Sequence, residues 1–327
     1  MRRPCVRVDR KAGEQTRREL EAAGLRDDEA AIESDGTHVY IPVTDPTAVD
    51  DGYTVVERDV DAREGLTMPE ELLDFAPTYE RLGDLVLLQE DDSDRAREAA
   101  AAFMASDLPV EGVLRRLSEV EGEIRVPRWE ILAGDHTETV HREYGAEFLV
   151  DPTTAYFSPR LATERERVVA QIEPDERVVD MFAGVGPYAI RAALAGATVL
   201  AVDINPAAVD YLRENVARNG VEAAVTVIEG DVRDAVEPYA GWADRLIMNL
   251  PHSADRFLEA AATLAGDRCR LHYYDIQPEP DAFEPGEGAI AEAFEPSHEV
   301  AVAGRHTVRS YAPGVVNVCL DVDLVAR

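Results

Sequence analysis

The second half of the chain alternates between short apolar runs and amphipathic stretches of helical period. The apolar runs, which are typical of buried strands, lie at residues 177–181, 198–203, 225–229, 246–249 and 269–274. Helices are predicted between the first three runs, at 187–195 and 206–219. Alternation of strands and helices indicates a mostly parallel sheet that is covered on both faces. We therefore predict a doubly wound, Rossmann-like α/β domain over residues 153–327.

The preceding residues show two smaller α+β patterns. The first contains a strand at 6–8, a helix at 13–23 and a hairpin around Ser34-Asp35-Gly36. The second contains an apolar strand at 85–88 and a helix at 93–105. Because a polar stretch from 59 to 69 separates the patterns, we predict a small N-terminal domain over 1–66 and a middle domain over 67–152.

Length and composition exclude several classes of protein. Of the 327 residues, 46% are hydrophobic, which is enough for packed cores and excludes wholesale disorder. No uncharged apolar run reaches the roughly 18 residues of a membrane span, and the start of the chain lacks the apolar core of a secretory signal. Cys5, Cys269 and Cys319 have neither metal-ligand nor redox spacing. We expect a cytoplasmic protein without a metal site or a disulfide scaffold.

The chain is strongly acidic, with 33 basic and 65 acidic residues and a net charge of −32. Such a charge costs self-repulsion in dilute buffer but favours solubility in concentrated salt, which indicates adaptation to a salt-rich cytosol. At about 1 M salt the screening length is only about 3 Å, so long-range attraction to phosphates is weak in any case. The acidity therefore does not exclude a nucleic-acid partner and only removes the usual basic patch.

A glycine-rich turn follows the first predicted strand of the α/β domain. Gly184 and Gly186 let the backbone turn tightly and approach a ligand at the carboxyl end of the strand. Asp203 ends the next strand, 19 residues after Gly184, where it can accept hydrogen bonds from ribose hydroxyls. Ala189 completes a Gly-x-Gly-x-x-Ala pattern. The turn alone fits a methyltransferase, a nicotinamide or flavin enzyme, or a turn without a ligand.

Three further features favour S-adenosylmethionine as the cofactor. Asp231 follows the third strand, where a carboxylate can accept a hydrogen bond from an adenine amino group. Asp180, at the turn, suits a cationic amine better than a pyrophosphate. Asn249 and Pro251, at the end of the fourth strand, present a fixed amide to a planar ring that contains nitrogen, although an Asn there can also cap the next helix. This last feature disfavours a nicotinamide oxidoreductase.

A set of motifs follows in fixed order along residues 115–327. They lie at 122–126, 132–134, 141–145, 156–165, the glycine turn, 249–251, 272–274 and 310–313. They resemble the archaeal and eukaryotic tRNA methyltransferases that methylate N1 of guanosine 37, beside the anticodon. The first 60 residues are similar to the accessory domain of that family, which grips the outer corner of the tRNA. The resemblance implies an S-adenosylmethionine-dependent enzyme that acts on tRNA with G37, and we expect a monomer.

Methylation of guanine N1 needs a base, because N1 carries a proton at neutral pH and its lone pair belongs to the ring amide. A carboxylate suits proton removal, and a guanidinium suits the negative charge that grows on O6. The resemblance assigns these roles to Glu164 and Arg125. It also implies that Asn249 holds the guanine edge, that Pro251 packs at the same wall and that Tyr156 orients the methyl donor.

The residues and the resemblance together predict a cofactor site and RNA contacts. The predicted cofactor site comprises Arg165, Asp180, Phe182, Gly184, Gly186, Asp203, Ile204, Asp231, Val232 and Asn249. Arg142 and Arg160 are expected to contact RNA phosphates, and the target base is expected to flip into the cleft between the middle and catalytic domains. His141 and His272 are expected to be structural, since neither has an acid or metal partner by sequence spacing.

Two alternatives stay open. One is a wyosine-pathway enzyme on the same nucleoside, which performs aminocarboxypropyl transfer or a further methylation. The pairs Arg160-Leu161 and Glu164-Arg165 fit the methyltransferase pattern better than the aminocarboxypropyl one. The other alternative, of a different class, is a non-catalytic module that binds tRNA without turnover.

Overall fold

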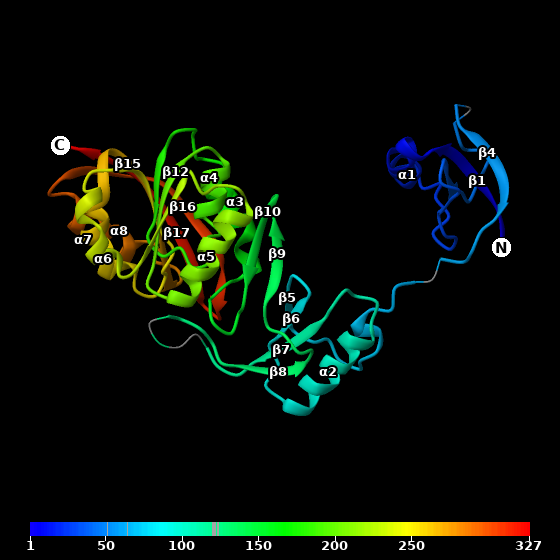
Figure 1. Ribbon diagram of the computed structural model, residues 1–327, viewed down its shortest axis with the longest axis horizontal. Coiled ribbons are helices and arrows are strands. Elements are labelled where there is room, and N and C mark those ends of the chain that lie inside the picture. The colour runs from blue at the N-terminus through cyan, green and yellow to red at the C-terminus, as the bar shows by residue number, and fades with distance from the viewer. Residues whose placement is uncertain (51, 64, 120–121, 123) are drawn as a thin grey trace. The chain divides into compact units, whose positions relative to one another are not determined.

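The computed structural model describes residues 1–50, 52–63, 65–119, 122 and 124–327. They form two units, Met1–Met68 and Pro69–Arg327, each with its own core (Figure 1). The further division at residue 152 stays a prediction. Among the described residues, no helix combines the length and the apolar character that a membrane span requires.

The first unit is a four-stranded antiparallel sheet with a helix. The strands are β1 (Arg2–Asp9), β2 (Glu33–Ser34), β3 (His38–Pro42) and β4 (Thr54–Asp59), in the order β2-β3-β1-β4. A 3-10 turn, η1 (Arg10–Ala12), leads into helix α1 (Gly13–Ala22). The predicted hairpin is present as β2 and β3, and the Asp35 carboxylate accepts backbone hydrogen bonds from Thr37 and His38 in its turn.

The second unit begins with a four-stranded sheet in the order β5-β6-β7-β8. Its elements are η2 (Pro69–Glu71), β5 (Tyr79–Leu82), β6 (Leu85–Leu88), α2 (Ser93–Ala105), β7 (Gly112–Arg116) and β8 (Trp129–Ala133). Asp92 caps α2, because its side chain accepts hydrogen bonds from the backbone amides of Asp94 and Arg95. Phe103 and neighbouring alanines of α2 bury an apolar face against Val86 and Val113 of the sheet.

A hairpin of β9 (Thr139–Glu143) and β10 (Ala146–Val150) joins this small sheet to the large one. Asn215 of helix α5 (Pro206–Arg218) and its C-cap Asn219 exchange side-chain hydrogen bonds with the backbone of Leu149 and Glu147 in β10. The hairpin is thereby tied to the large sheet's helical layer (Figure 1).

The large sheet has seven strands in the order β13-β12-β11-β14-β15-β17-β16. They are β11 (Arg177–Asp180), β12 (Thr198–Asp203), β13 (Val225–Glu229), β14 (Ala243–Met248), β15 (Ala265–Pro278), β16 (His298–Ala312) and β17 (Val315–Ala326). The first five strands in this order are parallel, and β17 is antiparallel to both of its neighbours. The predicted doubly wound α/β domain is confirmed.

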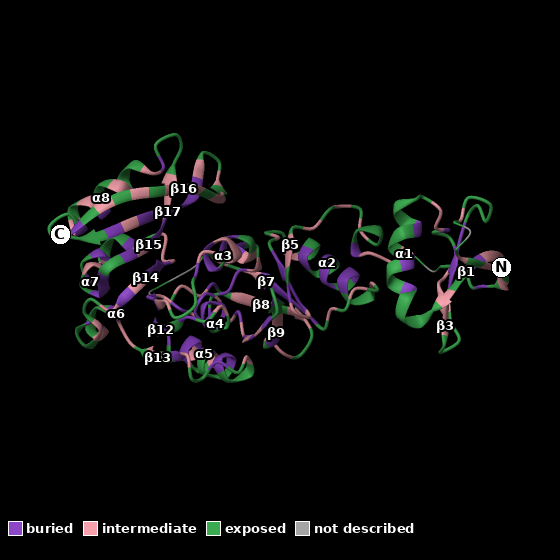
Figure 2. Cartoon of the chain, turned by 90° about the horizontal axis from the view of Figure 1, so that it is seen from above, coloured by how far each residue is buried: buried purple, intermediate pink, exposed green. Residues whose placement is uncertain are grey.

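Helices cover both faces of this sheet. One face carries α3 (Ala162–Val169), α4 (Ala189–Leu194) and α5 (Pro206–Arg218), and the other carries α6 (Val232–Ala235), α7 (Leu258–Leu264) and α8 (Glu284–Phe294). Short turns at η3 (Pro159–Leu161), η4 (Glu237–Tyr239) and η5 (Ala254–Phe257) complete the unit. The central strands β11, β12 and β14 are almost wholly buried, whereas the edge strand β16 is half exposed (Figure 2).

Candidate active site

A pocket of about 660 Å³ opens at the carboxyl ends of the parallel strands. One wall consists of the turns that follow β11, β12, β13 and β14, where ligands of open α/β sheets bind. Further lining residues are Glu119, Gly122, Ile124 and Arg125 between β7 and β8, residues 156–158, and residues of β16 and β17. One cavity therefore receives side chains from the middle region and from the doubly wound region.

The two glycines of the turn have different roles. Gly184 lines the pocket with φ +55°, and a Cβ there would have no neighbour closer than 3.8 Å, so its backbone is open to a ligand. Gly186 has φ +94°, and a Cβ there would lie 2.4 Å from Cδ1 of Leu212 in α5. Gly186 is outside the pocket lining, and its lack of a side chain serves the packing of α5 against the turn.

Asp203 connects the turns that follow β11 and β12. Its Oδ2 accepts a hydrogen bond of 2.6 Å from the Gly184 amide, and its Oδ1 accepts one of 2.9 Å from the Asn205 amide. Burial raises the pKa of this carboxyl. Asp203 lines the pocket, and each oxygen keeps a further acceptor site for a hydroxyl group.

Asp180, at the end of β11, is a buried carboxyl without a side-chain partner. It is 1% exposed, and no side chain in the described part of the chain donates to either of its oxygens. Burial, reinforced by the neighbouring Asp203 carboxylate, raises its pKa to about 7. An unpaired buried carboxyl fits a cationic amine, and S-adenosylmethionine carries an amine together with the ribose and adenine that the other turns suit.

Asp180 itself lies outside the pocket lining, directly before the lining residue Met181, whereas other predicted cofactor residues meet at this wall. Phe182, Ile204, Asp231 and Val232 all line the pocket, as does Asn249. Phe182 packs edge-to-face against Phe257, with 4.9 Å between ring centroids. The Asp231 carboxylate accepts hydrogen bonds from the backbone and side chain of Arg233, so its contact with an adenine amino group stays a prediction.

The predicted substrate residues Arg125, Tyr156, Asn249 and Pro251 line the same pocket. Arg125 is partly buried with φ +57°, and no carboxylate of the described residues lies within ion-pairing distance of it. Burial lowers its pKa. A guanidinium without a counter-ion in a pocket can receive an anionic oxygen. Glu123 of the 122–126 motif lies outside the described residues.

Glu164, the predicted base, does not line the pocket. It is 8% exposed on α3, and Arg167 donates to both of its oxygens over 2.8 Å. The Tyr274 hydroxyl donates to Oε1 of Glu164 over 2.7 Å and lies 2.8 Å from the Tyr188 hydroxyl. Because Tyr188 does line the pocket, two hydroxyl groups connect Glu164 to the cavity.

Comparisons with known proteins identify the group to which the chain belongs. The description "TRM5/TYW2 methyltransferase domain" matches residues 139–302, "tRNA methyltransferase 5 N-terminal domain" matches 5–51, and "TYW2 N-terminal domain" matches 63–137. The chain is 38% identical to the tRNA (guanine(37)-N(1))-methyltransferase Trm5b of Pyrococcus abyssi (strain GE5 / Orsay), over 97% of this chain and 98% of the relative. The chain belongs to the Trm5 family.

Two further similarities bear on the Trm5 assignment. A solved structure described as "The complex structure of aTrm5 and tRNALeu" matches 98% of this chain and 99% of that chain, with a TM-score of 0.71 and 32% identity. The tRNA(Phe) (4-demethylwyosine(37)-C(7)) aminocarboxypropyltransferase of Pyrococcus horikoshii (strain ATCC 700860 / DSM 12428 / JCM 9974 / NBRC 100139 / OT-3) is 34% identical over 78% of this chain and 92% of that protein.

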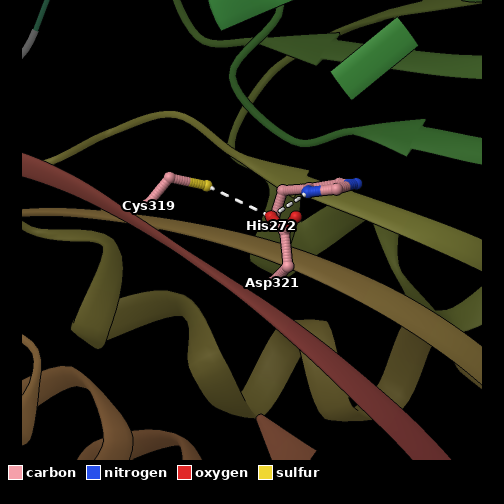
Figure 3. Close-up of side chains that lie close together, drawn as sticks. All are labelled: His272, Cys319 and Asp321. Carbon is pink, nitrogen blue, oxygen red and sulfur yellow. Dashed lines mark hydrogen bonds and ion pairs between the residues drawn. The ribbon is translucent and has the colours of Figure 1, made fainter. Parts of the chain in front are cut away.

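In this Trm5-family chain, a buried polar cluster lies beside Glu164. Nδ1 of His272 is 2.7 Å from Oδ1 of Asp321 (Figure 3). Nη1 of Arg245 is 2.6 Å from Nε2 of His272. Burial lowers the pKa of His272 to about 4, so at pH 7 the ring is neutral, accepts from Arg245 at Nε2 and donates to Asp321 from Nδ1. Arg167 links the cluster to Glu164, because it also donates to Oδ2 of Asp321 over 2.6 Å.

The expectation that His141 and His272 lack acid partners is wrong. His272 lies directly opposite Asp321 in the antiparallel pair of β15 and β17, a contact between residues 49 positions apart that spacing does not reveal. His141 lies 3.8 Å from Glu143, two residues away on the same face of β9. With Cys319, His272 and Asp321 have ligand atoms within 4.8 Å of one another. The guanidinium of Arg167, which also contacts Cys319 and Asp321, disfavours a cation there.

Three predicted arginines have carboxylate partners. Arg165 lines the pocket but is 2% exposed, and its Nε donates to Glu143 over 2.8 Å, so its contact with the cofactor stays a prediction. Arg142 pairs with Glu147 and Arg160 pairs with Glu80, both outside the pocket lining. Their contact with RNA phosphates also stays a prediction.

Several lining residues were assigned no role from the sequence. They are Tyr188, His252, Arg256, Arg309, Tyr311 and Asn317. Tyr311 belongs to the motif at 310–313, which pointed to this segment without indicating a role. Arg309 and Asn317 line the pocket because β16 pairs with β17, and no local sequence pattern predicts this pairing.

Proposed function

We propose that this protein transfers the methyl group of S-adenosylmethionine to N1 of guanosine 37 in tRNA. The proposal is supported by the similarity to Trm5b proteins along nearly the whole chain. The observation that carries it is the single pocket in which the cofactor-type turns meet Arg125, Tyr156 and Asn249. A transferase needs this arrangement, because donor and acceptor must meet in line within one cavity.

The turns of the doubly wound domain would hold the cofactor. S-adenosylmethionine supplies a methyl group made electrophilic by its positively charged sulfur. Asp180 would bind the cationic amine, Asp203 the ribose hydroxyls and Asp231 the adenine amino group. Phe182, Ile204 and Val232 would pack around the cofactor at the backbone opened by Gly184, and Arg165 would complete this side. Tyr156 would orient the methyl donor toward the target base.

On the acceptor side, Glu164 would take up the N1 proton of guanine through the Tyr188 and Tyr274 hydroxyls that connect it to the cavity. The N1 electron pair would form the new bond to the methyl carbon, and the electrons of the broken carbon–sulfur bond would go to sulfur. Arg125 would neutralise the charge that grows on O6, which it can do because no carboxylate of the described residues occupies it. Arg167 and the Tyr274 hydroxyl contact the Glu164 carboxylate and fix its orientation. Asn249 would hold the guanine edge, with Pro251 at the same wall.

The rest of the chain would deliver the RNA. We assign tRNA recognition to residues 1–66, RNA binding and part of the active site to 67–152, and catalysis to 153–327, in a monomer that works in the cytoplasm. Arg142 and Arg160 would contact phosphates, and the target base would flip into the pocket. Deleting residues 1–68 tests this division: S-adenosylmethionine binding should persist, and KM for tRNA should rise.

The second candidate is aminocarboxypropyl transfer from the same cofactor to the nucleoside at position 37, favoured by the similarity to the Pyrococcus horikoshii enzyme, whose name gives 4-demethylwyosine 37 as its substrate. The match of residues 5–51 to the tRNA methyltransferase 5 N-terminal domain supports methyl transfer instead. The experiment is transfer from labelled S-adenosylmethionine to a tRNA transcript with G37 and to its A37 control, in molar KCl. N1-methylguanosine, identified by mass spectrometry with G37 alone, supports the proposal. An aminocarboxypropyl product, or binding without turnover, contradicts it.

A further inference from the structure

Two buried carboxylates share the guanidinium of Arg167. Its Nε and Nη2 each donate to one oxygen of Glu164 over 2.8 Å, and its Nη1 donates to Oδ2 of Asp321 over 2.6 Å. Its Nη2 also donates to Oδ1 of Asp321 over 3.1 Å. Glu164 is 8% exposed and Asp321 is 3% exposed, so solvent screens neither charge strongly. Arg167 therefore belongs to Asp321 as much as to the proposed base.

Asp321 keeps its negative charge near neutral pH. Burial opposes this charge, but hydrogen bonds from His272 and Arg167 hold the pKa of the Asp321 carboxyl well below its usual range. The neutral His272 ring donates to Asp321 from Nδ1 and accepts from Arg245, which in turn donates to Glu176. Asp321 is thus a fixed negative charge on the side of Arg167 away from Glu164.

The other titratable groups beside these two carboxylates differ in whether their charge can change. Burial raises the pKa values of three of them well above the ordinary range, so they are neutral at pH 7: Tyr188, Tyr274 and Cys319. Arg165, next to Glu164 on α3, is paired with Glu143. His306 of β16 has its Nε2 3.3 Å from Oδ2 of Asp321, and a histidine can change its charge near neutral pH.

The proposed reaction changes the charge of Glu164, so the argument that follows rests on the proposed function. Once the N1 proton has reached Glu164, this side chain is neutral and no longer compensates Arg167. A partly buried guanidinium that loses its counter-ion is strongly unfavourable. Asp321 remains as a counter-ion, so Glu164 can take up the proton without leaving Arg167 uncompensated.

We propose that Asp321 acts through Arg167 to make Glu164 a stronger base. Without Asp321, Arg167 would serve Glu164 alone and would favour its charged form. With Asp321 present, the pair of Arg167 and Asp321 is neutral by itself, and Glu164 is free to accept a proton. Asp321 lies outside the pocket lining, so it is a positioning residue.

The test is the single-turnover rate of methyl transfer to G37 tRNA between pH 5 and 9, with S-adenosylmethionine saturating at each pH. The wild-type rate should fall at acidic pH as Glu164 becomes protonated. Asp321→Asn should move this acidic limb about one unit lower and reduce the plateau rate about 3- to 10-fold. Arg167→Gln should move the limb in the opposite direction, because it removes the positive charge that favours ionised Glu164.

Two control variants isolate the effect. Asp323→Asn is the matched control, because Asp323 lies two residues after Asp321 on β17 and pairs with Arg270 over 2.7 Å at a half-exposed position. It should keep the wild-type limb and plateau. His306→Gln should also keep the acidic limb, whereas its loss in this variant would show that His306 sets the limb and would overturn the proposal.

The direction of the shifts separates a charge effect from a structural one. A slower Asp321→Asn enzyme with an unshifted limb would show a structural role and overturn the proposal. Calorimetry of cofactor binding shows whether each variant is folded. If Asp321→Asn does not fold, the double variant with Arg167→Gln decides, since its limb should lie about one unit below that of Arg167→Gln. Equal limbs in these two proteins would overturn the proposal.

Failure of the proposed function gives a different result. In that case the wild-type enzyme would not methylate N1 of G37, or Glu164→Gln would methylate it at the wild-type rate. Either result refutes the role of Glu164 before any variant of Asp321 is measured, so the two failures are distinguishable.

Discussion

Two buried carboxyl groups of this chain, those of Glu164 and Asp180, differ in their side-chain hydrogen-bond partners. Glu164 is held by a guanidinium and a phenol hydroxyl, so its negative charge is compensated within the protein. Asp180 is as deeply buried, yet no side chain of the described residues donates to it. A protein keeps such a group uncompensated where a ligand supplies the counter-charge. The contrast supports the proposed binding of a cationic amine by Asp180, whereas the proton chemistry proposed for Glu164 rests on the family resemblance.

The raised pKa of Asp180 predicts how cofactor affinity depends on pH. Below about pH 7 the free protein holds this carboxyl protonated, whereas a bound amine favours its ionised form. Binding then releases a proton, so affinity should rise by up to about tenfold per pH unit between pH 5 and 7, where the amine stays protonated. Calorimetric titration of wild-type protein and Asp180→Asn checks this. Equal pH slopes of affinity for the two proteins would contradict the assignment. The slope would then come from another group, such as Asp203, whose pKa is also raised and which both proteins retain.

The two glycines of the turn serve different purposes: Gly184 leaves room for a ligand, and Gly186 leaves room for the packing of α5. Gly186→Ala should destabilise the fold by about 2–4 kcal/mol, because positive φ and a Cβ 2.4 Å from Leu212 add backbone strain to overpacking. Gly184→Ala should cost only about 1 kcal/mol, for its positive φ, but should weaken cofactor binding. Urea unfolding and calorimetry on both variants measure the two effects. Equal losses of stability would refute this division of roles.

At the scale of elements, the sequence predicted the helices and strands whose bounds depend on signals within the segment itself. The helix at 93–105 and the strands at 198–203 and 225–229 have the predicted bounds, since capping and apolar runs are sequence-local signals. The hairpin of β16 and β17 was not predicted, and β15 continues four residues past its predicted end. Half of β16 faces solvent, and its partner is chosen by the sheet rather than by its own residues.

The residues of the candidate site also differ in whether the sequence alone could select them. Asp180, Asp203 and Asp231 could be selected from the residues alone, because each lies within two residues of the end of a predicted strand. Arg125 and Glu164 stand in polar surroundings that indicate nothing by themselves, and only the family resemblance selected them. The pairing of His272 with Asp321 and the entry of Asn317 depend on the register of β15, β17 and β16, which becomes visible only in the folded sheet.

Helix α3 is attached to the sheet through charge. Arg167 of α3 bonds to Glu164 on its own helix and to Asp321 on β17. Arg167→Met would leave both buried carboxylates without their guanidinium partner, so we expect a loss of about 3 kcal/mol in the free energy of unfolding. Arg213→Met, which removes a half-exposed pair with Asp210 on α5, should cost less than about 0.5 kcal/mol. Urea unfolding at constant salt compares them, and similar losses would show that the buried cluster stabilises little.

At the scale of the whole molecule, the net charge of −32 opposes compaction and the approach of RNA. Salt screens both effects, with a Debye length that falls from about 10 Å at 0.1 M to about 3 Å at 1 M. Recognition of tRNA must then depend on short-range contacts such as those proposed for the pocket. We expect the melting temperature to rise between 0.1 and 2 M KCl. A melting temperature that stays constant or falls over this range would refute the self-repulsion argument.

The central claim is that one pocket joins the cofactor to guanosine 37, with Glu164 as the base. The most direct measurement is the single-turnover rate of methyl transfer to G37 tRNA by wild-type protein, Glu164→Gln and Glu166→Gln. Glu166 is the matched control, because it lies on the same helix as Glu164 but pairs with Arg191 of α4, whereas Glu164 contacts the Tyr274 hydroxyl. We predict N1-methylguanosine as the product, a loss of about 10²- to 10⁴-fold in Glu164→Gln and a rate near wild type in Glu166→Gln. A wild-type rate in Glu164→Gln, or a product without a methyl group on N1, would contradict the account.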